Sequence, residues 1–553
     1  MRPEDRERIQ LEVTSRVLER HMARSASGPD YLETLINDTI YNERRRLERD
    51  PPKGDEASFY AGLAKRLPKA SQVELKHMLE EMLRRFVAEV VGNFDERVYR
   101  LSTSVVPTGL SLLLKASSAA GPRDLLSLDG ISVVRDHIEL QGEVDHVKRL
   151  LGKGTLMVVP THSSHLDSIV LGYAAHLMEL PPLLYGAGLN LFTNPLISFF
   201  MNNLGAYRVD RKKTASIYKE VLKEYATVAM EMGYHNLFFP GGTRSRSGAV
   251  ESKLKKGLLG TAVTAYINNL KHERMRPNVY IVPCTISYDL VLEAETLIDD
   301  YLKEVGKSRY IIEDDEFSKP RRILNFMSEI ASLDGRIAVT FGRPLDIVGN
   351  FVDQEGRSLD PRGRVVDTKS YVLKNGVPEH DHQRDQEYTQ EIADAVVKGL
   401  RENNVVMSTN IVAYTLMRML KLKNPGMDLY RLLRTGGSTP SFPHGDVVRE
   451  TAATIELVKA AEQPRLADEV RSATALAAVD DALRHFKSYH THPVAERRGD
   501  RVFHEDRNLL LYYANRLSGY DLELRGARRS SGEPQASREV QSPGAQQSSG
   551  EPR

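Results

Sequence analysis

The chain has 553 residues, of which 41% are hydrophobic and 27% charged, as is usual for folded globular proteins. Its formal net charge of +1 excludes a surface that is basic throughout, so we expect no nucleic-acid partner and only local sites for anions. The single cysteine, Cys284, excludes an internal disulfide framework and is typical of a reducing compartment.

The apolar segments predict a protein without a membrane-spanning part. The N-terminus is charged and lacks the apolar core of a secretory signal peptide. The most apolar segment, residues 189–204, is shorter than the roughly 20 residues of a membrane-spanning helix and is interrupted by asparagine and proline. If the protein works at a membrane, we expect it to lie on the membrane surface.

Residues 1–125 are predicted to form a small helical domain. Ser71 and Glu74 have the spacing of a helix capping box, and apolar residues then recur every three or four positions. Residues 7–21 and 31–49 have a similar pattern.

Residues 126–345 alternate between short apolar runs and amphipathic segments. This alternation predicts an α/β domain with a mostly parallel sheet. The predicted strands are residues 138–140, 156–159, 183–185, 207–209, 237–239, 280–287 and 337–341. We expect residues 337–341 to be the last strand of the chain.

The rest of the chain divides into three parts. Residues 346–387 lose the pattern and are predicted to be a linker or an excursion. Residues 388–525 are predicted to be helical again, so the α/β domain has helical regions on both sides. Residues 526–553 are rich in Ser, Gly, Gln and Pro, contain the sequence SSGEP twice, and are predicted to be a disordered tail.

The stretch LMVVPTHSSHLD, residues 156–167, is the first candidate for chemistry. It is a buried strand ended by Pro160, then a polar turn that leads into an apolar helix. We expect His162 on the turn and Asp167 in the first helical turn, where the carboxylate can support the imidazole as a general base. A polar loop with a capping serine and a surface histidine remains an alternative on this motif alone.

Two later segments carry arginines that suit a phosphate. Residues 205–213 contain Arg211, and residues 238–248 (FFPGGTRSRSG) contain Arg244 and are followed by lysines. Glycines permit close approach of the backbone, and the guanidinium group matches phosphate oxygens. The second segment therefore predicts a phosphate-binding loop, with a solvated basic loop as the alternative.

These segments, taken in order, resemble the glycerolipid acyltransferase family. That family has an H-x-x-x-x-D motif, a G-x-x-x-x-x-R segment, an F-P-E-G-T-R-S segment and a later apolar strand with a proline. Further stretches at 285–302, 335–345, 403–417 and 509–517 look like the glycerol-3-phosphate acyltransferase branch. The four family segments are found here at residues 162–167, 205–211, 239–245 and 281–288.

The resemblance implies an acyltransferase domain and a reaction. An acyl chain would pass from acyl-CoA or acyl carrier protein to the 1-hydroxyl of sn-glycerol 3-phosphate, giving lysophosphatidate in the first step of phospholipid synthesis. His162 would deprotonate the hydroxyl, and Asp167 would orient the imidazole. No metal, cofactor or acyl-enzyme is implied. The protein would work as a peripheral protein on the cytoplasmic face of a membrane.

The resemblance also implies a substrate-binding set. The groups that would hold the phosphate are Arg211, Arg244, Ser245 and Lys255, and the loop of the substrate site would be Gly241, Gly242 and Thr243.

The chain departs from the family at one of these positions, because Gly241 stands where the family usually has glutamate. The role of that carboxylate is lost or supplied elsewhere. The acceptor therefore stays open between glycerol 3-phosphate, lysophosphatidate and dihydroxyacetone phosphate. A non-catalytic lipid-binding protein of the same fold is a further alternative. The oligomeric state is not predicted.

Other reactive side chains are predicted to be structural. Ser163 and Ser164 are expected to be turn or cap residues, His165 a packing residue, and Cys284 a buried thiol. The histidines at 380, 382, 485, 490 and 492 lack cysteines or an acidic frame at ligand spacing, so no metal site is predicted there.

Three phenylalanines allow two interpretations. We expect most of them to face the core. The alternative is that they line the acyl channel or, with neighbouring cations, contact anionic lipid. The residues are Phe192, Phe199 and Phe200, with Arg208, Lys212 and Lys213.

Overall fold

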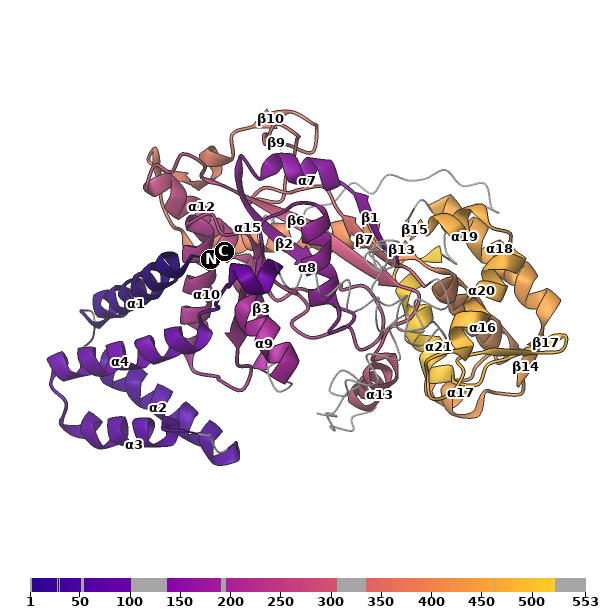
Figure 1. Cartoon of the computed structure of the whole chain (residues 1–553), viewed down its shortest axis with the longest axis horizontal. Helices are drawn as coiled ribbons and strands as arrows, with labels where there is room; N and C mark the ends of the chain where they lie inside the picture. The colour runs from indigo at the N-terminus through magenta and orange to yellow at the C-terminus, as the bar shows by residue number, and fades with distance from the viewer. Residues whose placement is uncertain are drawn as a thin grey trace, which may run out of the picture.

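The computed structural model describes residues 2–26, 28, 30–50, 54–100, 137–189, 195–305, 335–461 and 463–522. The central strands are β1 (Ile138–Gly142), β2 (Gly154–Pro160), β3 (Leu184–Gly188), β4 (Ala206–Val209), β5 (Asn236–Leu237), β6 (Asn278–Tyr288) and β7 (Ile337–Phe341). Within the described residues they form one seven-stranded sheet with the order β1-β7-β6-β2-β5-β3-β4 (Figure 1).

The sheet is mostly parallel, as the sequence predicted. β2 pairs in parallel with β5 and β6, and β3 pairs in parallel with β5 and β4. β1 is parallel to β7, whereas β6 and β7 are antiparallel. Because β2, β4, β5 and β6 run in one direction, their carboxyl ends lie at one edge of the sheet, where α/β enzymes place their sites.

Both faces of the sheet are covered by other elements, so β2 is buried along its whole length. Leu156 and Val158 pack into one hydrophobic cluster with residues of α8 (Asp167–Leu177). Met157 and Val159 pack into another with residues of α12 (Thr261–Lys271) and α15 (His382–Glu402). Side chains that alternate along a strand produce this division. The other helices near the sheet are α7 (Val144–Leu150), α9 (Pro195–Asn203), α10 (Ser216–Glu231), α11 (Lys256–Leu259) and α13 (Ala294–Val305).

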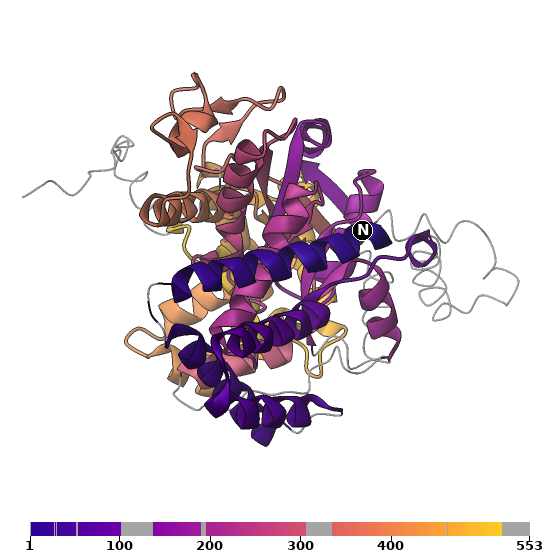
Figure 2. The same cartoon turned by 90° about the vertical axis from the view of Figure 1, so that its left-hand side faces the viewer.

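The N-terminal helices share a hydrophobic cluster with α10 and β4, and Figure 2 shows them in indigo on that side of the molecule. The predicted capping box is confirmed, since Ser71 Oγ accepts the Glu74 N–H and Glu74 Oε2 accepts the Ser71 N–H. The extent of an N-terminal domain stays a prediction, and residues 101–125 lie outside the described ranges. The elements are α1 (Pro3–Ser25), α2 (Tyr31–Arg49), α3 (Glu56–Arg66), η1 (Leu67–Lys69) and α4 (Gln72–Val90).

Short strands correct two predictions for the second half of the chain. Residues 337–341 are not the last strand, and residues 388–525 are not only helical. Strands of two or three residues leave no periodic pattern in a sequence, so the prediction missed them. They are β8 (Phe351–Val352), β9 (Ser358–Leu359), β10 (Val365–Val366), β11 (Leu373–Lys374), β12 (Val377–Pro378), β13 (Val405–Val406), β14 (Ser441–Pro443), β15 (Arg465–Leu466), β16 (Glu496–Arg498) and β17 (Arg501–Phe503).

Helices make up most of the C-terminal region. After α15, they are α16 (Ser408–Lys423), α17 (Leu429–Thr435), α18 (His444–Ala461), α19 (Asp468–Ser472), α20 (Ala475–Lys487), α21 (Arg507–Ala514) and η6 (Asn515–Leu517). The short helix η5 (Thr368–Val372) lies before this region, within residues 346–387. The predicted tail, residues 526–553, lies outside the described ranges.

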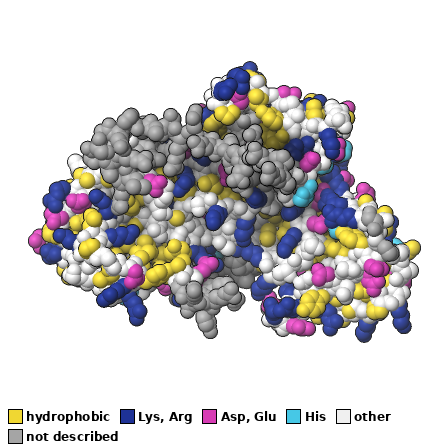
Figure 3. Space-filling model, turned by 180° about the vertical axis from the view of Figure 1, so that it is seen from behind, with side chains coloured by type: hydrophobic (Ala, Val, Ile, Leu, Met, Phe, Trp, Pro, Cys, Tyr) yellow, Lys and Arg dark blue, Asp and Glu magenta, His cyan; other side chains and the backbone are white. Residues whose placement is uncertain are grey.

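Two observations concern a possible contact with a membrane: the character of the helices and the charges on the surface. Among the helices that the structure describes, none has the length and apolar character needed to cross a bilayer. On the face seen in Figure 3, Lys and Arg side chains are interspersed with Asp and Glu, in keeping with the small net charge.

Candidate active site

Segments distant in the sequence meet at the carboxyl edge of the sheet. His162 follows β2, Arg211 follows β4, and Arg244 follows β5. Tyr288 is the last residue of β6. The parallel arrangement of these strands brings the predicted base and the predicted phosphate ligands to the same place.

The imidazole of His162 is bound to a buried carboxylate. His162 lies on the turn after β2, Asp167 begins α8, and Nδ1 lies 2.9 Å from Asp167 Oδ2. The same oxygen accepts the N–H groups of Ser163 and Ser164, and Oδ1 accepts the Tyr288 hydroxyl at 2.5 Å. These donors stabilise the carboxylate, which can only accept hydrogen bonds. Nδ1 therefore carries the hydrogen, and the lone pair is on Nε2.

The surroundings of His162 keep its ring in place and neutral. Phe239 stacks on the imidazole, with ring centroids 4.0 Å apart and planes inclined by 22°. Burial lowers the pKa of His162 from 6.5; Asp167 opposes this shift, and the cations of Arg244 and Arg211 add to it. A neutral imidazole with its lone pair on Nε2 is the form that a general base requires near pH 7.

Arg211 and Arg244 make this edge suitable for an anion. Both guanidinium cations lower the pKa of His162, as positive charges do to an imidazole. Burial and the neighbouring Arg244 lower the pKa of Arg211. Arg244 is also held by a buried carboxylate, because its Nη1 lies 3.3 Å from Glu293 Oε1. Two cations kept close together favour an anion between them, and their planar groups match a phosphate.

The loop after β5 is bonded to the turn that carries His162. The N–H of Ser245 donates to the His162 carbonyl at 2.6 Å, and the Ser245 hydroxyl donates to the Ala249 carbonyl at 2.6 Å. Both hydrogens of Ser245 are thus engaged within the protein. The predicted contact of this serine with phosphate stays a prediction.

Lys255 lies against Gly242 of the same loop. A Cβ at Gly242 would come within 2.7 Å of Lys255 Nζ, and its φ of +74° also favours glycine. Gly241 and Thr243 flank it, and Thr243 is exposed. Of the predicted substrate set, Lys255 therefore contacts the loop of Gly241, Gly242 and Thr243, and its side chain is exposed.

Two carboxylates that no sequence motif singles out hold the His162 turn. Glu293, which is buried, accepts the Ser164 hydroxyl at 2.7 Å and the His165 N–H at 3.0 Å. Glu251 accepts the His162 N–H at 2.7 Å. Glu293 is 128 positions from His165, and Glu251 is 89 positions from His162. Hydrogen bonds over such separations leave no local pattern, so the sequence could not have revealed these contacts.

The C-terminal region also reaches this site. The side-chain amide of Asn515 donates to the Ser247 carbonyl at 2.9 Å. The buried guanidinium of Arg516 donates to the Ile286 carbonyl in β6 at 2.7 Å. The loop of residues 238–248, which is predicted to bind phosphate and is called the phosphate loop below, and strand β6 are thereby bound to one short segment after α21.

Several other predictions can be compared with the structure. Ser163 and Ser164 are turn residues, as expected. Cys284 is a buried thiol in β6, and burial raises its pKa. His165 is buried beside His162, with 6.2 Å between ring centroids. In the described ranges no group of three His, Cys, Asp or Glu side chains is placed to hold a metal ion.

Of the three phenylalanines, most of which are expected to face the core, Phe199 is 47% exposed. It lies on α9, which packs beside β4 at the edge of the sheet and keeps one side towards solvent. Phe192 and the side chain of Phe200 lie outside the described set.

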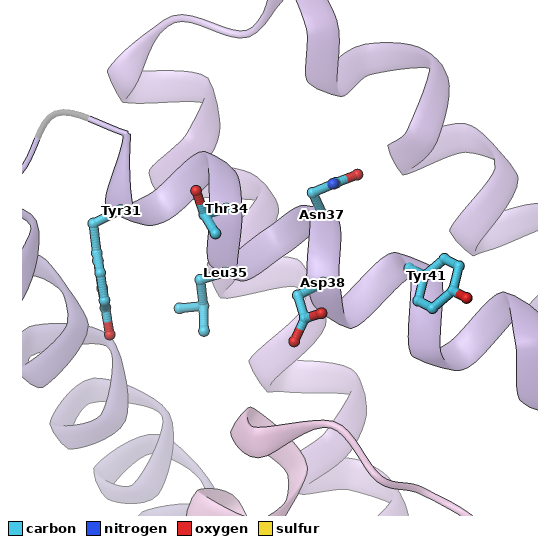
Figure 4. A pocket seen from close by; sticks show the side chains of 6 residues that line it. All are labelled: Tyr31, Thr34, Leu35, Asn37, Asp38 and Tyr41. Atoms are coloured by element: carbon cyan, nitrogen blue, oxygen red, sulfur yellow. The ribbon is translucent and has the colours of Figure 1, made fainter.

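A hollow on the N-terminal helices is separate from this site. Its volume is about 390 Å³, and all six lining residues belong to α2 (Figure 4). Asp38 is the one carboxylate among them, and neither a histidine nor an arginine lines it. The hollow therefore lacks both an imidazole base and a cation that could bind phosphate.

The comparisons with known proteins agree with the geometry. Residues 137–287 match the protein-family model described as Acyltransferase. A glycerol-3-phosphate acyltransferase of Haemophilus influenzae (strain PittEE) is 30% identical over 206 residues, which are 37% of this chain and 23% of the relative. The enzyme of the same name from Pseudomonas fluorescens (strain Pf0-1) is 27% identical over 328 residues, 58% of this chain and 35% of the relative. These matches confirm the resemblance expected from the sequence motifs.

The matches have limits of length and of shape. The chain spans about a quarter to a third of the length of these curated relatives. A 1-acyl-sn-glycerophosphate acyltransferase of Thermotoga maritima, known as a crystal structure, is 15% identical, with a TM-score of 0.25, over 55% of this chain and 93% of that one.

Proposed function

We propose that this chain transfers an acyl group from an acyl thioester to the 1-hydroxyl of sn-glycerol 3-phosphate. The observation that carries the proposal is a neutral His162, bound to Asp167 at Nδ1, with the cations of Arg211 and Arg244 beside it. The base and the phosphate ligands of one small acceptor are thus close together. The names of the relatives support the same acceptor.

The proposed reaction is a direct transfer. Nε2 of His162 takes the hydroxyl proton while the oxygen attacks the thioester carbonyl carbon. The carbon–sulfur bond then breaks, and the leaving thiolate takes the proton back from the imidazolium to become a thiol. Asp167 stabilises the transient imidazolium, and Arg211 and Arg244 hold the phosphate so that the hydroxyl lies near the base.

The test is an assay of the purified chain with glycerol 3-phosphate and either acyl-CoA or acyl carrier protein. We expect 1-acylglycerol 3-phosphate by mass spectrometry and an equal amount of free thiol. His162→Ala should lower the rate on the order of 10²–10⁴-fold. His176→Ala, in α8 but outside the site, is the matched control. Full activity of His162→Ala would refute the mechanism.

Two other acceptors are also candidates, because Gly241 stands where the family usually has a carboxylate. Lysophosphatidate and dihydroxyacetone phosphate should therefore compete in the same assay. We expect glycerol 3-phosphate to give the highest kcat/KM. A higher value for either competitor would reassign the acceptor and leave the role of His162 intact.

We also propose that the protein binds membranes peripherally, which the exposed Phe199 on α9 supports. Anionic liposomes should sediment the wild-type chain, and Phe199→Ser should weaken this binding. Tight liposome binding without acyl transfer from any donor would favour a non-catalytic lipid-binding protein.

A further inference from the structure

Glu251 holds the main chain of His162, the proposed base. Its Oε1 accepts the His162 N–H at 2.7 Å, while the Ser245 N–H donates to the His162 carbonyl at 2.6 Å. Ser245 and Glu251 belong to the same segment as Arg244. The segment that is proposed to bind phosphate therefore also forms hydrogen bonds with both the N–H and the carbonyl of His162.

The carboxylate of Glu251 lies where a side chain at position 241 would reach. A Cβ at Gly241 would lie 3.3 Å from Glu251 Cγ and 3.6 Å from its Oε1. The carboxylate oxygens of a glutamate lie roughly 3–4 Å from its own Cβ. A glutamate at position 241 could therefore place an oxygen where Glu251 Oε1 now lies.

The backbone at position 241 accepts a side chain, but the space there is crowded while Glu251 is in place. Gly241 is not among the glycines with positive φ, so its conformation is open to other residues. A Cβ there would lie 3.2 Å from the Thr243 carbonyl oxygen and 3.3 Å from Glu251 Cγ, so Glu251 would have to move to admit a second side chain. Burial, to which Asp167 adds, raises the pKa of Glu251 to about 7 against the opposing effects of the His162 N–H and Arg516. A second carboxylate beside it would add repulsion.

Building on the proposed function, we propose that Glu251 is a positioning residue that replaces the carboxylate missing at position 241. It fixes the base relative to the phosphate loop through the N–H of His162. Because it acts on the base and not on the phosphate, its loss should lower kcat and leave KM for glycerol 3-phosphate nearly unchanged. A displacement of a reacting group by about 1 Å can cost on the order of 10²-fold in rate.

The experiment moves the carboxylate from one position to the other. Glu251→Ala should lower kcat roughly 10–100-fold, and Glu251→Gln should lose much less because the amide oxygen still accepts the N–H. Gly241→Glu alone should lower kcat through crowding. The double variant Gly241→Glu/Glu251→Ala should recover most of the loss. Ser252→Ala, at the exposed neighbouring position, is the control for the segment.

A second measurement does not depend on activity. Hydrogen–deuterium exchange at the His162 amide should be faster in Glu251→Ala and slow again in the double variant. Wild-type kcat in Glu251→Ala, or a folded double variant no better than Glu251→Ala in either measurement, would overturn the positioning role. Absence of acyl transfer by the wild-type chain would instead refute the proposed function, and the exchange series would still decide on Glu251.

Discussion

The two helical regions lie at opposite ends of the sheet in Figure 1 and contact it by different means. The N-terminal helices pack on α10 and β4 and add charged contacts, with Arg16 paired to Glu231 at 2.7 Å and Lys213 to Glu89 at 2.6 Å. The C-terminal helices α16 and α21 belong to the same hydrophobic cluster as β2 and β6. Segments of similar helical character in the sequence therefore have different relations to the site.

The difference extends to the site residues. On the N-terminal side, Lys213 follows Arg211 closely and is held by three carboxylates of the preceding helices, at Glu43, Glu56 and Glu89. On the C-terminal side, Arg516 and Asn515 bond directly to the backbone of β6 and of the phosphate loop. We infer that the N-terminal helices hold the segment of Arg211, the proposed phosphate ligand. The C-terminal region holds the backbone of β6 and of the loop after β5, and so stabilises the site as a whole.

The largest effect is expected from Arg516→Ala. The buried guanidinium donates to Asn404 Oδ1, the Ile286 carbonyl and Ser287 Oγ at 2.6, 2.7 and 3.1 Å. Its loss leaves buried acceptors without donors, so the free energy of unfolding should fall by about 4 kcal/mol. Urea denaturation measures this, and a change below about 1 kcal/mol would contradict a framework role for the C-terminal region.

Lys213→Met should have the next largest effect. It removes the cation that Glu43, Glu56 and Glu89 share, and leaves only Arg46 and Arg85 to pair with them. We therefore expect a loss of about 2 kcal/mol in the free energy of unfolding. Displacement of Arg211 should also raise KM for glycerol 3-phosphate more than it lowers kcat. The matched control is Lys212→Met, whose ion pair with Asp50 is exposed to solvent and should contribute little to stability. Equal effects of the two variants would show that the buried cluster has no special role.

Asn515→Ala should have a smaller effect. It removes the hydrogen bond to the Ser247 carbonyl, with an expected loss of about 1 kcal/mol. Because Ser247 belongs to the phosphate loop, kcat/KM should fall several-fold while the fold is kept. Steady-state kinetics with a melting curve separate the two effects, and unchanged kinetics would place the loop outside the influence of the C-terminal region.

The smallest effect is a shift in the pH profile. Arg211 lowers the pKa of His162, so Arg211→Gln should raise that pKa. The base is active when deprotonated, and the acidic limb of kcat should therefore move to higher pH in the variant. Lys212 is exposed and paired with Asp50, so Lys212→Met should leave the limb in place. An unchanged limb in Arg211→Gln, or a shift to lower pH, would contradict the placement of Arg211 beside the base.

Much of the fold followed from the sequence because its signals are local. A buried strand ended by Pro160 and followed by His162 and Asp167 was sufficient to predict a strand, a turn and a helix that begins near Asp167. The periodic patterns predicted α2 and α4 and the mostly parallel sheet. The short strands of the C-terminal region were missed, because strands of two or three residues leave no periodic pattern.

The sequence by itself determined the chemical inventory: a histidine and a carboxylate five residues apart, two arginine segments, and the glycine at position 241. Only the tertiary structure decided which groups support them. Tyr288, Glu293, Glu251 and Arg516 reach the His162 turn and β6 from distant parts of the chain. Hydrogen bonds between such residues depend on how the strands are ordered in the sheet, and no spacing along the chain encodes them.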